Sequence, residues 1–182
     1  TVIRINNNGD TLWTTTLNET AQDVCLPRVR SLLNGNFLVT WCQDTTLFIY
    51  DEPEVFYVLD PNGHIIKKQT YPLSYYKGIV SIKLTANGDV LACGETFMNN
   101  ILGGISGASL RRINPNGEVL WEREYFNPHW YEQGSGANVL FDVAEADNGD
   151  IVGTGFVLHN NEQNQGEISI WLLKTNANGC FT

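Results

Sequence analysis

Short apolar runs recur along the whole chain, and seven of the gaps between them contain an Asn-Gly pair. Both residues tolerate the positive φ that a two-residue hairpin turn requires, so Asn-Gly between such runs is a strong hairpin signal. Helical periodicity is absent from the sequence. The pattern therefore predicts an all-β chain built from hairpins.

The Asn-Gly pairs form two interleaved series of nearly equal period. The glycines of the first series are 54, 54 and 62 residues apart: Gly9, Gly63, Gly117 and Gly179. Those of the second series are 53 and 61 residues apart: Gly35, Gly88 and Gly149. Two series with matching periods indicate an internal repeat that contains two hairpins, and hence four strands.

The second complete repeat shows the predicted strands most clearly. They are Ile79–Ala86, Asp89–Glu95, Ser109–Asn114 and Glu118–Tyr125. Four antiparallel strands that recur at this period are the signature of a β-propeller, in which each four-stranded sheet is one blade.

The predicted fold is a β-propeller segment of about three and a half four-stranded blades, an incomplete ring. We expect a half blade over 1–17, blades over 24–71 and 79–125, and a blade without its outer strand over 138–182. A last blade without an outer strand results when that strand comes from the other end of the same protein. We therefore expect the ring to be completed mainly by N-terminal blades of the same protein, or else by other protein chains. Two copies would give twenty-six strands, which is not a whole number of four-stranded blades, so that closure is less favoured.

Composition excludes several classes of protein and partner. Aromatic residues make up 11% and charged residues 17% of the chain, a balance that opposes disorder. The net charge is −9 and the eleven Lys and Arg residues are scattered, so nucleic acid is excluded as a predicted partner. The sequence contains no apolar run of membrane-helix length, and we expect no membrane insertion.

The cysteines do not indicate whether the protein lies in an oxidising or a reducing compartment. Cys25 and Cys42 flank one predicted hairpin, where a distorted disulfide and two buried thiols are both compatible with the pattern. Cys93 follows an apolar run and is expected in the core. The start of the chain, TVIRINNNGDTLW, lacks signal-peptide features, which fits a mature or truncated product as well as a cytosolic one.

The longer connections are predicted to share the rim opposite the Asn-Gly turns. They comprise 43–54, 96–108 and 156–167 within repeats, and 18–23, 72–78 and 126–137 between repeats. Loops on a rigid scaffold often carry function, and exposed aromatic residues are common in recognition. The candidate binding residues are aromatic or histidine side chains of this rim: Tyr50, Tyr75, Tyr76, His129, Trp130, Tyr131 and His159.

Trp130 and Tyr131 lie in the most distinctive of these segments, 126–138. They can offer flat surfaces to a sugar ring or a partner protein. Alternatively, Trp130 folds back and covers the apolar space between two blades.

No catalytic or metal site is expected. The histidines His64, His129 and His159 are dispersed and lack a recognisable nucleophile. The turn Asp147-Asn148-Gly149-Asp150 loosely resembles a calcium loop, but the repeat explains it better as a hairpin turn. We therefore expect a protein that is not an enzyme and that has no cofactor or metal.

Two resemblances to known propellers follow from these motifs. The segments from Gly9 to Trp13 and from Gly117 to Trp121 read G-x-x-x-W, which resembles the tryptophan motif of quinoprotein-type propellers. Lys67 replaces the tryptophan in one repeat and the last copy ends at Thr182, and no residue matches a quinone or metal site. This resemblance implies architecture alone.

The alternation of L-x-P-N-G-x-V-L-W with A-x-N-G-D-I-V-x-x-G is similar to the propellers of large secreted proteins of Bacteroidota. In those proteins a last repeat like WLLKTNANGCFT often precedes a C-terminal sorting domain for type IX secretion, which is not in this sequence. The resemblance implies export and a life outside the cell or on its surface, and no activity.

The sequence thus predicts a non-catalytic interaction module of a secreted or cell-surface bacterial protein, which binds a protein or glycan through the rim of long loops. One alternative is a fragment of a glycan-cleaving propeller enzyme with its site at the ring axis. Another is a structural subunit of a larger extracellular assembly.

Overall fold

The computed structural model describes residues 1–17, 27–41, 54–71, 76–98, 105–126, 137–160 and 166–181. These residues form thirteen strands and no helix, which confirms the all-β prediction. There is accordingly no helical segment within these ranges that could span a membrane.

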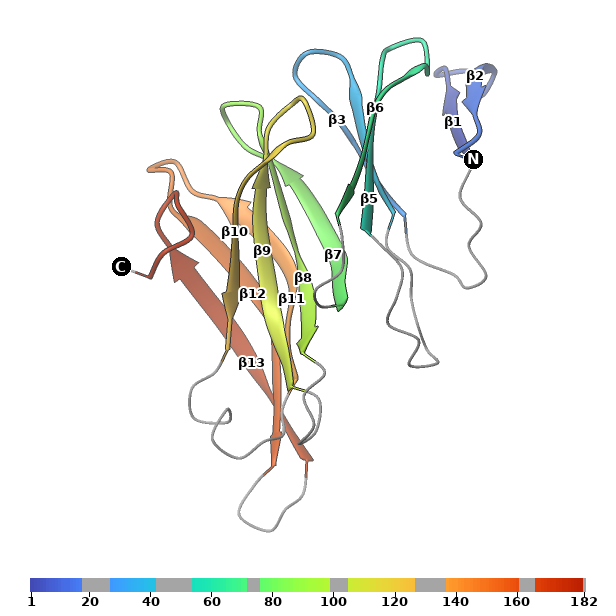
Figure 1. Cartoon of the computed structure of the whole chain (residues 1–182). Helices are drawn as coiled ribbons and strands as arrows, with labels where there is room; N and C mark the ends of the chain where they lie inside the picture. Colours follow the sequence, from blue (N-terminus) through green and yellow to red (C-terminus); the bar gives the residue numbers. More distant parts are fainter. Residues whose placement is uncertain are drawn as a thin grey trace.

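The strands form four antiparallel sheets of two, four, four and three strands, the grouping expected from the repeat (Figure 1). The first sheet contains β1 (Val2–Ile5) and β2 (Thr11–Thr15). The second contains β3 (Arg28–Ser31), β4 (Phe37–Trp41), β5 (Glu54–Leu59) and β6 (Ile65–Tyr71). The third contains β7 (Tyr76–Leu84), β8 (Val90–Met98), β9 (Ile105–Ile113) and β10 (Val119–Tyr125). The fourth contains β11 (Ala137–Glu145), β12 (Ile151–Asn160) and β13 (Gly166–Thr175). Within each sheet, strands that follow one another in the sequence are neighbours.

Several strands extend further from the Asn-Gly turns than predicted. The segments 96–108 and 156–167 were expected to be connections, but β8 pairs with β9 as far as Met98 and Ile105, and β12 pairs with β13 as far as Asn160 and Gly166. Glycine and polar residues in these segments are poor strand formers by themselves, but backbone hydrogen bonds to the neighbouring strand keep them extended. The connections at this rim are therefore shorter than the sequence suggested.

The seven Asn-Gly turns all lie at one rim of the molecule, the upper one in Figure 1. They are three-residue loops, and the prediction of two-residue turns is wrong. In the first one, the Asn6 N–H donates to the Asp10 carbonyl and the Gly9 N–H to the Asn6 carbonyl. Only the glycine needs the left-handed region, and the seven glycines have φ between 72° and 91°. This is a type I turn followed by a left-handed residue.

In the loops of the first Asn-Gly series, the residue three places before the turn glycine explains why the turn forms. The side-chain Oδ1 of Asn6 accepts the N–H groups of Asn8 and Asp10. Asp60 does the same for Asn62 and His64. A short polar side chain that binds the backbone of its own loop stabilises the turn before any tertiary contact forms.

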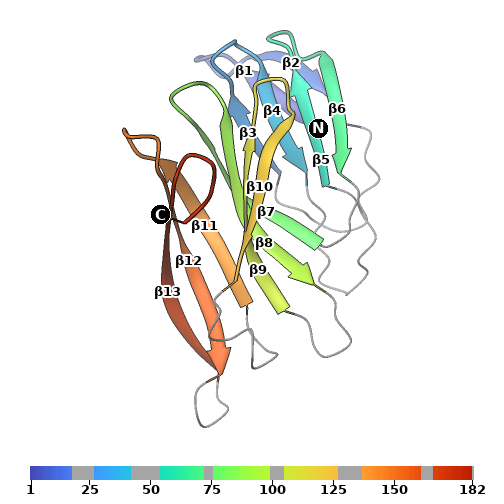
Figure 2. The ribbon, with the colours of Figure 1, turned by 60° about the vertical axis from the view of Figure 1, so that its left-hand side comes forward.

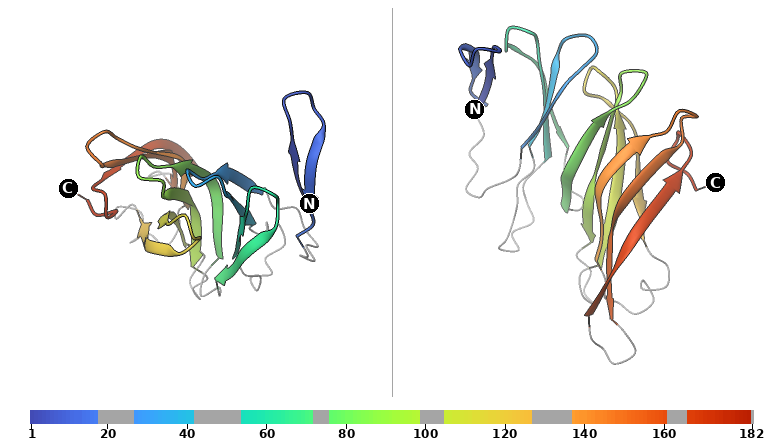
Figure 3. Two further views of the ribbon diagram at one scale, coloured as in Figure 1. Left: turned by 90° about the horizontal axis from the view of Figure 1, so that it is seen from above. Right: turned by 180° about the vertical axis from the view of Figure 1, so that it is seen from behind.

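The sheets stack face to face, and each gap between neighbours holds one apolar cluster (Figures 2 and 3). Leu38 and Phe56 of the second sheet, for example, pack with Ile82 and Val90 of the third. The third and fourth sheets meet through a cluster that includes Leu110 and Leu140. Every inner sheet is thus apolar on both faces, which is the condition for a stack rather than a single solvated sheet.

The tryptophan of one sheet packs on the turn glycine of the next. The Trp13 Nε1–H donates to the Pro61 carbonyl at 2.9 Å, and a Cβ added to Gly63 would lie 2.5 Å from the Trp13 ring. Trp121 contacts Gly179 in the same way. Between the second and third sheets Lys67 stands in place of the tryptophan, and its Nζ lies 3.3 Å from Glu118 Oε1.

Glycines in the middle strands face a backbone bulge in the neighbouring strand. β11 is irregular between Leu140 and Asp142, and Gly155 pairs with Leu140. A Cβ on Gly155 would lie 1.7 Å from the Val139 carbonyl oxygen. A Cβ on Gly94 would lie at the same distance from the Gly78 carbonyl oxygen, beside the bulge of β7. The repeated glycine of the VLACG and IVGTG segments therefore accommodates a bulge.

We predict that Gly63→Ala destabilises the chain more than Gly149→Ala. Both substitutions place a side chain in the left-handed region, at φ of 86° and 82°, which costs ~1–2 kcal/mol. Only Gly63→Ala also displaces the Trp13 ring, because the nearest atom to a Cβ on Gly149 is 3.9 Å away. The additional loss should be about 1–3 kcal/mol, as for other overpacked sites. Urea unfolding of both variants measures it, and equal losses would contradict the tryptophan contact.

Candidate functional site

The structure places two of the predicted rim residues at strand ends away from the Asn-Gly turns. The backbone of Tyr76 begins β7 and pairs with Phe97, and that of His159 lies near the end of β12 and pairs with Glu167. Their side chains lie outside the description, as do whole residues of the same set: Tyr50, Tyr75, His129, Trp130 and Tyr131. Binding at this rim, and both alternatives for Trp130, therefore stay predictions. Cys25 and Cys42 also lie outside the described residues.

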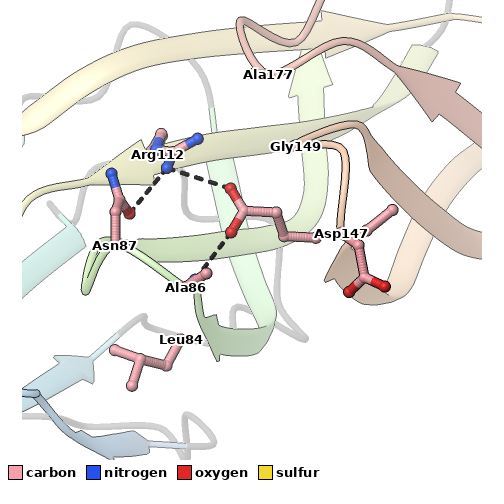
Figure 4. Close-up of a pocket in the computed structure, with 9 residues that line it drawn as sticks. Leu84, Ala86, Asn87, Arg112, Asp147, Gly149 and Ala177 are labelled. Atoms are coloured by element: carbon pink, nitrogen blue, oxygen red, sulfur yellow. Dashed lines mark hydrogen bonds and ion pairs between the residues drawn. The ribbon is translucent and has the colours of Figure 1, made fainter.

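A pocket of about 450 Å³ lies at the opposite rim, between the third and fourth sheets (Figure 4). It is bounded by the β7–β8 turn on one side and the β11–β12 turn on the other. Its lining comprises Leu84, Ala86, Asn87, Arg112, Glu145, Ala146, Asp147, Gly149 and Ala177. No pattern in the sequence indicated this pocket, because its walls come from two turns that belong to successive repeats and are about sixty residues apart in the sequence.

Arg112 of β9 is the central charged group of the pocket (Figure 4). Its Nε donates to Asp89 Oδ2 at 2.7 Å and its Nη2 to Asn87 Oδ1 at 2.9 Å. The same Nη2 lies 3.3 Å from Glu145 Oε1 of the next sheet. The other carboxylate oxygen of Glu145 accepts the Ala86 N–H at 2.9 Å. Arg112 and Glu145 therefore fasten the turns of two sheets together.

The charges of the pocket favour a cationic or neutral group over an anion. Two carboxylates line the pocket, those of Glu145 and Asp147, together with the guanidinium of Arg112, which is also paired with the Asp89 carboxylate. Because Arg112 already donates to Asp89, Asn87 and Glu145, its guanidinium serves to hold the third and fourth sheets together. The arrangement accounts for the local fold and indicates no reaction.

The Asp147–Asp150 turn behaves as the repeat suggested. Asp150 Oδ2 lies 2.9 Å from Lys174 Nζ and accepts a hydrogen bond from the Asn148 side chain. These two bonds, with the Lys174 bond the stronger influence, lower the pKa of the Asp150 carboxyl. Within the described ranges no three His, Cys, Asp or Glu side chains gather as a metal site would require.

Basic residues of the first strand in the second and third sheets contact the following sheet. The Nε groups of Arg28 and Arg30 donate to the carbonyls of Val80 and Ile82 in β7, at 2.6 and 2.7 Å. One sheet further on, Lys83 Nζ lies 3.0 Å from the carboxylate of Asp142. The scattered basic residues of the sequence thus include several that join neighbouring sheets through the first strand of each.

A buried polar group lies between the third and fourth sheets, toward the rim of long connections. The Asn138 backbone N–H donates to Ser106 Oγ at 3.2 Å, and the Asn138 side-chain amide donates to the Ser106 carbonyl at 2.8 Å. The Ser106 hydroxyl also hydrogen-bonds to the carboxylate of Glu95. Burial nevertheless raises the pKa of Glu95 above its ordinary value of 4.5, because desolvation of the charged form outweighs that bond.

Burial also affects two groups that could otherwise be reactive. Desolvation raises the pKa of the Cys93 thiol to about 12 and that of the Tyr125 hydroxyl to about 12. The Tyr125 hydroxyl donates to the Gly179 carbonyl at 2.6 Å. Cys93 is thus a core residue, as expected, and Tyr125 is part of the contact between the last two sheets.

Comparison with known proteins adds no family. The chain matches no model of a known protein family and no curated protein. Its function must therefore be argued from its own residues.

We predict that Glu95→Gln makes the chain relatively more stable as the pH rises. A carboxyl with a raised pKa in the folded state contributes stability below the unfolded pKa of 4.5 and loses it as the pH rises through the folded value. Glutamine keeps the hydrogen bond from Ser106 but does not ionise. The free energy of unfolding, measured in urea from acid to neutral pH, should therefore fall for the native chain relative to Glu95→Gln.

The matched control is Glu167→Gln, which removes an exposed carboxylate of β13. It changes the net charge by the same amount as Glu95→Gln, so it shows how much of any difference comes from net charge alone. Parallel curves for Glu95→Gln and the native chain would contradict the buried position of Glu95.

Proposed function

We propose that the chain is a β-propeller segment that serves as a non-catalytic interaction module, and that it binds a protein or glycan through the rim opposite the Asn-Gly turns. In the same proposal, the protein is bacterial and acts outside the cell or on its surface. The resemblance of the repeats to secreted propellers of Bacteroidota supports this second part.

The observation that carries the proposal is that contacts between sheets occupy the turn rim. At the turn rim, side chains are occupied by contacts between sheets: Trp13 with Pro61, Arg112 with Glu145, and Tyr125 with Gly179. These contacts fix the sheets relative to one another and leave short, uniform turns. The sequence segments that join strand ends away from these turns differ in length, from four residues over 72–75 to twelve over 42–53. Variable segments on a rigid scaffold often carry recognition.

The chemistry of the candidate residues suits a flat or ring-shaped ligand. Trp130, Tyr131 and Tyr75 offer large aromatic surfaces with a polar edge, and such side chains dominate the energetics of recognition interfaces. Sugar rings present apolar C–H faces that pack on aromatic rings, and protein partners insert side chains between them. Either ligand would use the same residues.

We predict that Trp130→Ala abolishes binding and leaves the melting temperature unchanged. The probe is a glycan array, followed by titration of the glycan that gives the strongest signal. Phe181→Ala is the matched control, because Phe181 is an exposed aromatic residue at the turn rim. It should bind like the native chain.

The opposite result would assign Trp130 to the fold. A drop of several degrees in melting temperature with binding retained would mean that Trp130 covers apolar space between sheets. Failure of the native chain to bind any glycan on the array would remove the glycan part of the proposal.

A further inference from the structure

All seven Asn-Gly turns share one backbone, which makes their asparagines comparable. In each turn the glycine N–H donates to the carbonyl three residues before it, at 2.8–3.1 Å, and the glycine has a positive φ. The residue immediately before the glycine, here called the turn asparagine, is exposed in all seven. Any difference that the fold makes between the turn asparagines therefore comes from side-chain contacts.

In the first series, the residue three places before the glycine leaves the turn asparagine unbonded. The Asn114 side chain accepts the Glu118 N–H at 2.9 Å and donates to the Glu118 carboxylate at 2.8 Å. The corresponding N–H bond in the other three loops is accepted by Asn6, Asp60 and Asn176. Among the residues that the structure describes, no side-chain hydrogen-bond partner is found for the turn asparagines of this series, Asn8, Asn62, Asn116 and Asn178.

In the second series the turn asparagine takes over this role. Its Oδ1 accepts the N–H of the residue after the glycine, at 3.1–3.2 Å, in all three loops: Asn34, Asn87 and Asn148. Asn87 is held by two further bonds, because its Nδ2 donates to Asp89 Oδ2 at 3.0 Å and its Oδ1 accepts from Arg112 Nη2 at 2.9 Å. The two series thus differ in whether the side-chain amide of the turn asparagine is fixed.

This difference controls a reaction to which asparagine before glycine is open. The glycine nitrogen forms a bond to the asparagine Cγ, the Cγ–Nδ2 bond breaks, and Nδ2 leaves as ammonia with the proton that the glycine nitrogen gives up. Glycine permits this close approach because it has no side chain. Water then opens the resulting succinimide at one of its two carbonyls, which gives aspartate or isoaspartate. Cγ must turn toward the glycine nitrogen, so hydrogen bonds that fix the amide must first break.

We propose that the turn asparagines of the first series, such as Asn62 and Asn116, are sites of deamidation through a succinimide, and that those of the second series are protected by their own hydrogen bonds. Asn116 and Asn87 of the third sheet give the clearest comparison. A Cβ on Gly117 would lie 2.9 Å from Val58, and one on Gly88 would lie 3.2 Å from Leu33. Packing of the two glycines is therefore similar, and the side-chain bonds of the two asparagines differ.

The modification lies where two sheets meet. Gly117 packs on Val58 of the preceding sheet, as Gly63 packs on Trp13. Isoaspartate at Asn116 lengthens the backbone of the turn by a carbon atom, which moves Gly117 away from its contact with Val58, and either product adds a negative charge. The inference does not depend on the proposed binding at the opposite rim, because it uses the Asn-Gly turns alone.

The test is peptide mapping by mass spectrometry of the 182-residue chain, sampled during incubation in mildly alkaline buffer. Water is the only reagent. Asn116 should convert to aspartate and isoaspartate at least about tenfold faster than Asn87, whose amide is held by the bonds from Asp89 and Arg112. In urea, where the fold is lost, the two asparagines should convert at similar rates.

Two reciprocal substitutions exchange the loop types. Asn114→Ala removes the acceptor of the Glu118 N–H, so Asn116 can accept it and should convert about fivefold more slowly. Alanine suits this position, because Ala146 occupies it in the Asn148 loop, which forms the same turn. Ala146→Asn supplies a new partner for Asp150 and should accelerate conversion of Asn148 by a similar factor. Circular dichroism shows that both variants are folded.

Equal conversion of Asn116 and Asn87 in the folded chain would overturn the proposal, as would an Asn116 that stays intact while the chain in urea converts. Faster conversion of Asn116 in the Asn114→Ala variant, or an unchanged rate at Asn148 in the Ala146→Asn variant, would also overturn it. A difference that persists undiminished in urea would belong to the neighbouring sequence instead of the fold, and would contradict the protection by hydrogen bonds.

Discussion

Coverage of both faces of each sheet is the constraint on which this structure depends. Tyr57 and Phe56 are neighbours on β5 that point to opposite sides, yet each is almost fully buried, one against the first sheet and the other against the third. A sheet with two apolar faces cannot be stable alone in water. The repeat therefore makes sense only as a stack, and each interface inside the stack must be supplied by a neighbour.

Polar contacts at the turn rim fix how the stacked sheets are oriented. Apolar packing by itself is non-directional. Trp13 with the Pro61 carbonyl, Arg112 with Glu145, and Tyr125 with the Gly179 carbonyl each join a side chain of one sheet to a turn or strand end of the next. Such bonds tolerate little sliding, because a hydrogen bond weakens steeply when its distance or angle departs from the preferred geometry. The short turns at one rim and the rigid support for longer connections at the other follow from this arrangement.

Much of this fold could be predicted from the sequence, because its signals are local. The Asn-Gly pairs, together with Asn6 and Asp60 that begin two of the loops, determine where hairpins turn. The number of strands and their division among sheets follow. The length of the strands does not follow, because β8 and β12 extend through residues whose strand character depends on a paired neighbour. Nor could the sequence show that Gly155 faces a bulge, or that Trp13 meets a glycine fifty residues later.

The candidate site could be predicted less well. The sequence indicated the rim that carries Tyr76 and His159, and the structure places the backbones of both residues at strand ends away from the turns. It gave no sign of the pocket around Arg112, whose partners Asp89 and Glu145 belong to different repeats and have no distinctive spacing. Side-chain partners across a sheet interface depend on the angle between sheets, which local pattern does not determine.

The most direct measurement is the nuclear magnetic resonance signal of the turn glycines. An indole ring shifts protons above its face upfield, so the α-protons of Gly63 and Gly179 should be shifted upfield relative to those of Gly149, which has no ring nearby. Gly63 should also show a nuclear Overhauser effect to the Trp13 ring. Chemical shifts alike in all three glycines, with no Trp13–Gly63 contact, would contradict the stacked arrangement of sheets.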